Sequence, residues 1–335
     1  MKKLIIPLIL LAAVMAATSL AQRRGADRSS SGGLTASRGH EDQLYVEVSA
    51  LGNLDYFYDH KLGMELAGKA LGVRTEYVGP AEYDIPAMIT AFEQALAKPG
   101  LKGIVVVGFE PALVPIINKA VESGVPVVTA DADLPESKRV AFVGTGNYQA
   151  GVEGGAKLAE LIGGKGKVAL MTKVGQSNLE ERIRGYKDSL AGFRDIELVQ
   201  IVDTQSDAVI AAQVATAVLR KNPDLAGIGC VEAAGGTGAA TAVKESGLAG
   251  KVKIVSMDRG NEVLELIGQG VISASIAQRT ALMPLYAVQI LYNLANQDVP
   301  ITEDNVRAGI STTPASIDTG VIVVDKSNYK YFLRK

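Results

Sequence analysis

Residues 166–193 read GKVALMTKVGQSNLEERIRGYKDSLAGF, and they hold one complete structural unit. The unit opens with the short apolar run Val168–Met171, passes through a polar segment at 172–178 and becomes amphipathic from Leu179 to Ala191. Continuous apolar runs are typical of strands whose two sheet faces are both covered by helices. This stretch therefore predicts a strand, a turn and a helix in that order.

The same unit recurs along the chain on both sides of this stretch. Further apolar runs occur at Leu44–Val48, Gly103–Val107, Val127–Thr129, Leu198–Val202, Ile228–Cys230, Val252–Met257 and Ile272–Ala277. Helical stretches lie between them at Pro86–Ala97, Ala112–Ser123, Ala150–Ile162, Ala208–Leu219 and Gly238–Ser246. Regular alternation of this kind predicts βαβ units with parallel strands. The units are too many for one small sheet, so a closed barrel and two doubly wound lobes are the alternatives, and the glycine-rich bend at Gly144–Asn147 favours two lobes.

The N-terminus predicts export. Lys2 and Lys3 precede the apolar run Leu4–Ala17, and the small residues of Ser19-Leu20-Ala21 suit a signal peptidase. This order predicts a signal peptide at 1–21, with an uncleaved anchor as the alternative. Residues 22–41 are polar, with a basic cluster followed by serines and glycines, and predict a flexible leader. Because no cysteine lies near the cleavage site, we expect a periplasmic protein without a lipid anchor.

Composition excludes several classes of function. The 34 basic and 36 acidic residues give no overall field that would attract nucleic acid. Cys230 is the single cysteine, so no disulfide is possible within the chain. His40 and His60 are the only histidines, so we expect no metal site, no cofactor and no histidine-based catalytic triad. We expect a monomer.

Polar and aromatic residues recur just after the predicted strands. Ligands of open parallel sheets lie outside the carboxyl ends of the strands. The residues in this position are Ser49, Asn53, Tyr56, Phe57, Asp131, Arg182, Glu232, Asp258 and Gln278. Each could separately cap a helix, lie in solvent or, for the rings, belong to the core. Their recurrence favours a ligand site, and rings beside paired hydrogen-bonding groups suit a sugar.

Three segments resemble a known family. Residues 178–186, with Arg182, Gly185 and Tyr186, resemble the Arg-x-x-Gly-aromatic helix start of the ribose- and galactose-type substrate-binding proteins of ABC importers. Residues 255–258 and 273–278 resemble two further strand ends of that family. The resemblance extends from Leu44 to about Val324.

This resemblance implies roles for several of the residues. Asp258 and Gln278 stand where the family ends two strands with an aspartate and a glutamine. Arg182 matches an arginine that donates to the sugar, Asp131 matches an aspartate that accepts from sugar hydroxyls, and Tyr56 and Phe57 match rings against the sugar face. Two departures leave the identity of the sugar open: Ala132 follows Asp131 where ribose binders carry arginine, and Glu232 replaces a common asparagine.

The fold and function implied by the resemblance are those of a two-lobed binding protein. One lobe comprises 42–144 with 279–307, and the other 145–278 with 308–335. The hinge crossings are expected near 144–147, 278–280 and 308–311. The protein is expected to catalyse nothing, to bind a monosaccharide or related polyol between the lobes, and to deliver it to the membrane permease of an ABC importer by hinge closure. Docking to a chemoreceptor is compatible with this function.

Two alternatives remain at the sequence level. The glycine-rich segment 235–240 follows a strand, and Asp258 lies about 20 residues further on, as in a dinucleotide fingerprint. This pattern would indicate a nicotinamide-dependent sugar oxidoreductase, although Thr241 stands where the third glycine belongs. For Glu232, a ligand contact is one alternative, and a helix cap or an ion pair with Arg259 is the other.

Overall fold

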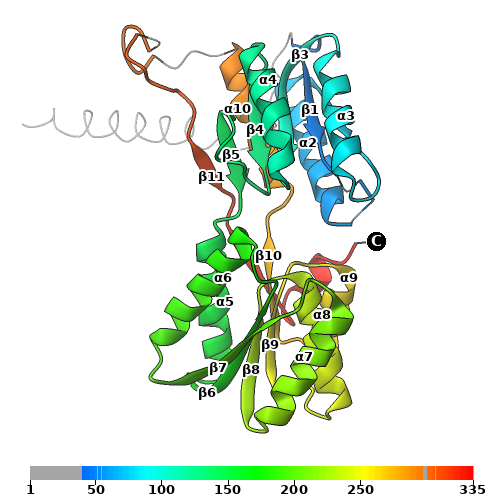
Figure 1. Ribbon diagram of the computed structural model, residues 1–335, viewed down its shortest axis with the longest axis vertical. Helices are drawn as coiled ribbons and strands as arrows, with labels where there is room; N and C mark the ends of the chain where they lie inside the picture. Colours follow the sequence, from blue (N-terminus) through cyan, green and yellow to red (C-terminus); the bar gives the residue numbers. More distant parts are fainter. Residues whose placement is uncertain (1–39, 51, 54, 297–299, 306, 335) are drawn as a thin grey trace, which may run out of the picture.

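The computed structural model describes residues 40–335 except 51, 54, 297–299, 306 and 335. The predicted signal peptide and all but the last two residues of the predicted leader lie outside the described residues. The alternation of strands and helices is confirmed. The chain forms two α/β lobes, one above the other in Figure 1, and each is built on a six-stranded sheet. No helix in the described ranges is long and apolar enough to cross a bilayer.

The first lobe contains a wholly parallel sheet with strand order β11-β5-β4-β3-β1-β2. The strands are β1 (Leu44–Val48), β2 (Arg74–Val78), β3 (Leu101–Val107), β4 (Val127–Ala130), β5 (Ala141–Gly144) and β11 (Ser316–Asp318). The helices are η1 (Asp55–Phe57), α2 (Tyr58–Leu71), α3 (Ile85–Leu96), η2 (Pro111–Leu113), α4 (Val114–Glu122) and α10 (Leu282–Asn296). Helices α2 and α10 cover one face of the sheet, and α3 and α4 cover the other, which explains the continuous apolar runs.

The second lobe repeats this arrangement, with strand order β12-β10-β9-β8-β6-β7. Its strands are β6 (Lys165–Thr172), β7 (Asp195–Asp203), β8 (Leu225–Cys230), β9 (Lys253–Met257), β10 (Ala274–Gln278) and β12 (Val321–Asp325). Its helices are α5 (Asn147–Leu161), α6 (Ser177–Ala191), α7 (Ala208–Lys221), α8 (Ala233–Glu245), α9 (Asn261–Gly268) and η3 (Tyr329–Tyr331). Helices α5 and α6 lie on one face, and α7, α8 and α9 on the other. Only β12 runs antiparallel to its neighbour among the strands described here.

The repeated strand order places Asp131 and Asp258 at equivalent positions. Each is the first residue after its strand, β4 or β9, and each has a left-handed backbone, with φ of 64° and 65°. Aspartate tolerates this conformation better than most residues. The backbone N–H of Asp131 donates to Val143 and that of Asp258 to Ile276, in the neighbouring strand of each sheet. Each carboxylate is thus fixed at the edge of its own lobe that faces the other lobe.

Three crossings connect the lobes, and the third differs from the expected one. The chain crosses after β5 and after β10, close to the predicted positions. The expected division assigned all of 308–335 to the second lobe, but Ser316–Asp318 pairs with β5 in the first sheet. The third crossing therefore lies between β11 and β12. A three-residue strand with two polar residues carries no apolar run, so no hydrophobic pattern predicts it.

The glycine-rich segment 235–240 is not a loop. It forms the first turns of α8, and its glycines allow close packing. A Cβ on Gly236 would lie 1.8 Å from Ser256 Oγ in β9, and one on Gly238 would lie 2.4 Å from Ala211 Cβ in α7. The segment therefore serves helix packing, and the loop expected for a dinucleotide-binding oxidoreductase is absent from this described part of the chain.

Candidate functional site

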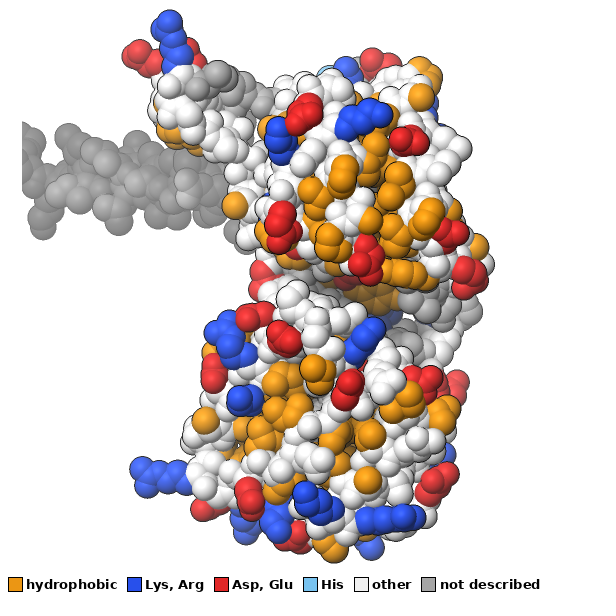
Figure 2. All heavy atoms as spheres, in the orientation of Figure 1, with side chains coloured by type: hydrophobic (Ala, Val, Ile, Leu, Met, Phe, Trp, Pro, Cys, Tyr) orange, Lys and Arg blue, Asp and Glu red, His pale blue; other side chains and the backbone are white. Residues whose placement is uncertain are grey.

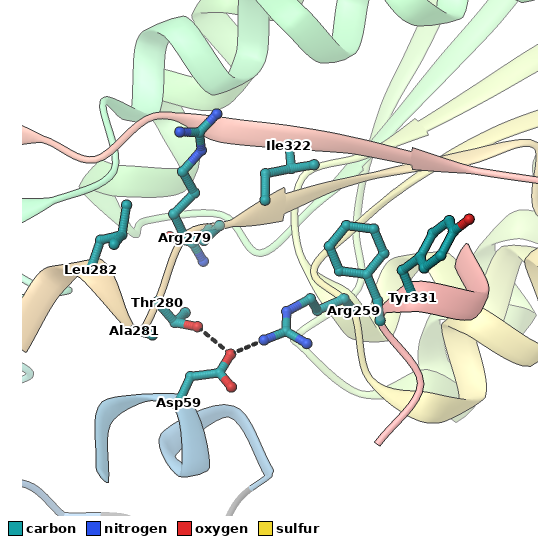
Figure 3. A pocket seen from close by; sticks show the side chains of 10 residues that line it. Asp59, Arg259, Arg279, Thr280, Ala281, Leu282, Ile322 and Tyr331 are labelled. Atoms are coloured by element: carbon teal, nitrogen blue, oxygen red, sulfur yellow. Dashed lines mark hydrogen bonds and ion pairs between the residues drawn. The ribbon is translucent and has the colours of Figure 1, made fainter. Parts of the chain in front are cut away.

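The candidate site is a cavity of about 220 Å³ between the lobes, at the carboxyl ends of strands from both sheets. It is lined by Tyr56, Asp59, Ala233, Asp258, Arg259, Gly260, Gln278, Thr280 and Arg334. A second cavity of about 440 Å³ lies towards the hinge and the C-terminal tail. Figure 3 shows its lining, which includes Arg279, Ile322 and Tyr331. We take the smaller cavity as the ligand site because three strand-end residues predicted from the sequence line it.

Tyr56 and Asp131 form a wall in the first lobe. The Tyr56 hydroxyl donates to Asp131 Oδ1 at 2.5 Å. Burial raises the pKa of Tyr56 well above its ordinary value, and the nearby carboxylates of Asp131 and Asp258 raise it further. The phenol therefore stays protonated and remains a donor, while Asp131 supplies acceptor oxygens at the same place.

Phe57 belongs to the core of the first lobe. Its ring is buried and lies edge-on to Tyr56, with ring centroids 5.1 Å apart. On its other sides it meets His60 at 5.0 Å and Phe109 at 6.0 Å. Phe57 therefore supports the Tyr56 ring from behind and is not among the residues that line the cavity. Phe109, two residues after the end of β3, was not predicted from the sequence.

Arg182 supplies a fixed cation in the second lobe. It is buried on α6, where Nε donates to Asn147 Oδ1 at 2.8 Å and one terminal nitrogen donates to the Val231 carbonyl at 3.0 Å. These bonds use two of the five N–H donors of the guanidinium. The Arg182 charge also acts on Asp258 and Tyr56, because it opposes the rise in the pKa of each. Arg182 thus lies within electrostatic range of the cavity.

Asp258 and Gln278 form the second lobe's wall. Gln278 Nε2 donates to Asp258 Oδ1 at 3.0 Å, and the Ser275 hydroxyl donates to the Asp258 backbone carbonyl. Burial raises the pKa of Asp258, although Arg182 and the Gln278 amide counteract it. The arrangement offers carboxylate acceptors and amide and guanidinium donors within one small cavity, which matches the paired needs of hydroxyl groups.

Glu232 is the N-cap of α8. Its Oε2 accepts from Ala234 N, and its Oε1 accepts from Gly235 N and from Thr204 Oγ1, all at 2.8 Å. Burial raises the pKa of Glu232, and these hydrogen bonds oppose the rise. The cap alternative is the arrangement observed, whereas Arg259 pairs with Asp59 and not with Glu232. The neighbouring Ala233, and not Glu232, lines the cavity.

Ser49 and Asn53 do not line the cavity. Ser49 is fully buried at the end of β1, and Asn53 is exposed on the following loop, where its backbone N–H donates to the Ala81 carbonyl. The structure thus brings together Tyr56, Asp131, Asp258 and Gln278, with Arg182 nearby. Of the predicted residues, Tyr56, Asp258 and Gln278 line the cavity, and Asp131 reaches it only through its hydrogen bond from Tyr56. Arg182, Ser49, Asn53, Phe57 and Glu232 are not among the lining residues.

A cluster around Asp59 was not predicted from the sequence. Asp59, in the first turn of α2, is nearly buried and pairs with two arginines of the second lobe. Arg259 contacts Oδ2, Arg334 approaches Oδ1 at 3.0 Å, and the hinge residue Thr280 donates to Oδ2 at 2.6 Å (Figure 3 shows the Arg259 and Thr280 contacts). Asp59 lies inside a helix and Arg334 near the C-terminus, so neither follows a strand.

Comparison with known proteins shows what this chain resembles. Residues 46–298 match the model of a periplasmic binding protein domain. The D-allose-binding periplasmic protein of Escherichia coli K12 is 30% identical over 250 residues, which cover 70% of this chain and 79% of that protein. The ribose import binding protein of Bacillus subtilis is 28% identical, over 74% of this chain and 80% of its own length.

Solved structures agree with these matches. The arabinose-binding protein AraP of Geobacillus stearothermophilus superimposes with a TM-score of 0.82 and 37% identity, over 88% of this chain and all of that one. A periplasmic solute-binding protein of Actinobacillus succinogenes, solved with bound D-allose, gives a TM-score of 0.73 at 25% identity, over 87% of this chain and all of that one.

Proposed function

Because this chain belongs to the periplasmic binding protein family, we propose that it binds a monosaccharide or related polyol between its lobes and delivers it to an ABC-type importer. The observation that carries this proposal is the meeting of strand-end side chains from both lobes at one cavity. Tyr56, which bonds to Asp131, comes from the first lobe, and Asp258 and Gln278 come from the ends of the second lobe's strands.

The chemistry of the cavity suits a neutral, polyhydroxylated ligand. A hydroxyl group both donates and accepts, so it needs acceptors and donors side by side. Asp131 and Asp258 provide acceptors, while Arg182, Gln278 and Tyr56 provide donors. The positive and negative charges near the cavity are mixed, which gives no general preference for an anion or a cation. The proposed ligand contacts are these residues. Phe57 would support Tyr56 from behind, Glu232 would cap α8, and Ser49 and Asn53 would make no contact with the ligand.

Hinge closure is the proposed mechanism of delivery. Each lobe supplies part of the site, so a ligand contacts both halves only when the lobes are together, and it stabilises that state by its differential affinity. Asp59 already joins the lobes through Arg259 and Arg334. The permease of the importer would recognise the closed arrangement. We further propose that the protein is exported by cleavage after Ala21, acts as a monomer in the periplasm and catalyses no reaction.

Thermal-shift measurements over pentoses, hexoses and polyols test this function. The panel should include D-allose, D-ribose and arabinose, which relatives of this chain are named for binding. A ligand at 100 times its Kd stabilises the folded state by about 2.7 kcal/mol, so at least one sugar should raise Tm clearly. An amino acid or NAD that raises Tm while every sugar leaves it unchanged would overturn the proposal.

A further inference from the structure

A histidine–glutamate pair is buried behind the first lobe's half of the cavity. Glu47 on β1 and His60 on α2 both have side chains that are 0% exposed, and His60 Nδ1 lies 2.5 Å from Glu47 Oε1. Desolvating two charges is expensive, and a buried pair is weak evidence for stability by itself. The location of this pair, beneath two residues of the proposed site, indicates a role in that site.

The contacts of His60 lead directly to the cavity. Its ring centroid lies 5.0 Å from that of Phe57 and 5.9 Å from that of Tyr56. The Tyr56 hydroxyl in turn donates to Asp131, so His60 supports both groups of the first lobe's wall. His60 therefore packs near the Tyr56 ring and interacts electrostatically with Asp131.

His60 is surrounded by acidic groups. Burial lowers the pKa of His60, but the carboxylates of Glu47, Asp131 and Asp59 outweigh burial and raise it above the ordinary value. The titratable groups around the pair are Glu47 from β1, Tyr56 from η1, Asp59 from α2, Tyr77 from β2 and Asp131 after β4. In an imidazolium both ring nitrogens are donors, so Nε2 carries an N–H while Nδ1 donates to Glu47.

Several polar atoms around the pair are buried without a partner in the described part of the chain. They are Glu47 Oε2, Ser49 Oγ, His60 Nε2 and Tyr77 Oη. Glu47 is paired opposite Tyr77 in the β1–β2 register, and Ser49 lies on the same face two residues further on. Buried polar atoms of this kind are normally satisfied by ordered water or by a ligand. The pair therefore lies in a polar environment that adjoins the site.

We propose that His60 is a positioning residue of the sugar site: its imidazolium, held by Glu47, orients Tyr56 and Asp131 towards the ligand. The inference rests on the proposed function. Loss of the His60 proton leaves the Glu47 and Asp131 carboxylates without this cation between them. The wall formed by Tyr56 and Asp131 then loosens, and the sugar binds less tightly.

The test is the pH profile of the calorimetric Kd for the sugar with the largest thermal shift, measured from about pH 6 to about pH 9. In the wild-type protein the affinity should fall by about tenfold as pH rises through the raised pKa of His60, as expected when a buried donor is lost. His60→Gln should bind about tenfold more weakly at neutral pH and show a flat profile. Glu47→Gln keeps the shape of the buried side chain but removes its charge, so the fall in sugar affinity should move to lower pH.

His40→Gln is the matched control, because His40 is the only other histidine of the chain. It should keep the wild-type affinity and profile. A Kd of the wild-type protein that does not change with pH would overturn the inference without any variant. A His60→Gln protein with a lowered Tm but the wild-type Kd and pH dependence would also overturn it. If His60→Gln fails to fold, the direction of the Glu47→Gln shift decides. A wild-type protein that binds no sugar would instead refute the proposed function.

Discussion

At the scale of single residues, the Asp258 carboxylate lines the cavity, the equivalent Asp131 bonds to the lining residue Tyr56, and the Arg182 guanidinium acts on Asp258 from α6. Asp131 and Asp258 take the same left-handed backbone after β4 and β9, so their position is set by the fold. Arg182 is held by Asn147 and the Val231 carbonyl, so its orientation does not depend on the ligand. Preorganised groups of this kind lose little freedom when a ligand binds.

Arg182→Ala and Asp258→Ala should each weaken sugar binding by about 2–5 kcal/mol, because each removes one partner of a desolvated, charge-assisted hydrogen bond. Calorimetry measures the loss, and circular dichroism checks the fold. Arg184→Ala is the matched control, because Arg184 lies on the same helix but is exposed and pairs with Glu181. Wild-type affinity in both variants would show that neither Arg182 nor Asp258 contacts the sugar.

Glu232→Gln should lower stability modestly, by about 1 kcal/mol, because the N-terminal dipole of α8 favours a charged acceptor at the cap. The ranking of sugars should be preserved, since Glu232 is engaged by Thr204, Ala234 and Gly235. Thermal melts and a sugar panel separate the two effects. A changed ranking at unchanged Tm would show that Glu232 contacts the ligand instead.

The Glu47–His60 pair should also make stability depend on pH. Because the pKa of His60 is raised in the folded protein, the unfolded state binds fewer protons above its own pKa of about 6.5. The contribution of His60 to the free energy of unfolding is fully present below that pH. It is lost as pH rises through the pKa that His60 has in the folded protein. Urea unfolding across this window should show a fall in the free energy of unfolding that His60→Gln lacks. Parallel curves for the two proteins would contradict the raised pKa.

At the scale of elements, α8 shows how glycine serves packing in this fold. Gly236→Ala should destabilise the protein by about 1–3 kcal/mol, the range for overpacking, because its Cβ would meet Ser256 Oγ at 1.8 Å. Gly192→Ala is the control, because its Cβ would make only an ordinary contact at 3.4 Å. Denaturant unfolding compares the two, and equal effects would mean that the packing of α8 on β9 adjusts freely.

The central strands could be predicted from the sequence, whereas of the edge strands only β7 was predicted, through its apolar run Leu198–Val202. Leu44–Val48 was predicted with the observed bounds of β1, because both faces of that strand are covered. Edge strand β2, with Arg74, Thr75 and Glu76, gave no apolar run. Of the residues that line the cavity, Tyr56, Asp258 and Gln278 were among those predicted from the sequence, whereas Asp59, Thr280 and Arg334 were not. Their roles depend on contacts between the two lobes, and local sequence patterns do not predict such contacts.

At the scale of the whole molecule, the lobes meet through a narrow waist with charges of both signs around it (Figure 2). Figure 1 places the C-terminus at this junction, where Arg334 reaches Asp59. The two arginines that hold Asp59 belong to the second lobe, so these ion pairs exist only while the lobes are close. The network therefore stabilises the closed arrangement of the lobes, and a bound ligand would add to that stabilisation.

Asp59→Asn should open the ligand-free protein and weaken sugar binding by about 1–3 kcal/mol, because Arg259 and Arg334 lose their charged partner. Small-angle scattering should report a larger radius of gyration without sugar than for the wild type. Glu122→Gln, which breaks an exposed pair with Lys138 far from the cavity, is the control. An unchanged radius and an unchanged Kd would show that Asp59 does not hold the lobes together.

The measurement that tests the central claim most directly is calorimetric titration of the mature protein with the sugar that gives the largest thermal shift. We predict saturable binding of one sugar per chain, abolished in the Arg182→Ala/Asp258→Ala double variant and retained in Arg184→Ala. No heat from any sugar of the panel, or undiminished binding in a folded double variant, would contradict a sugar site between the two lobes.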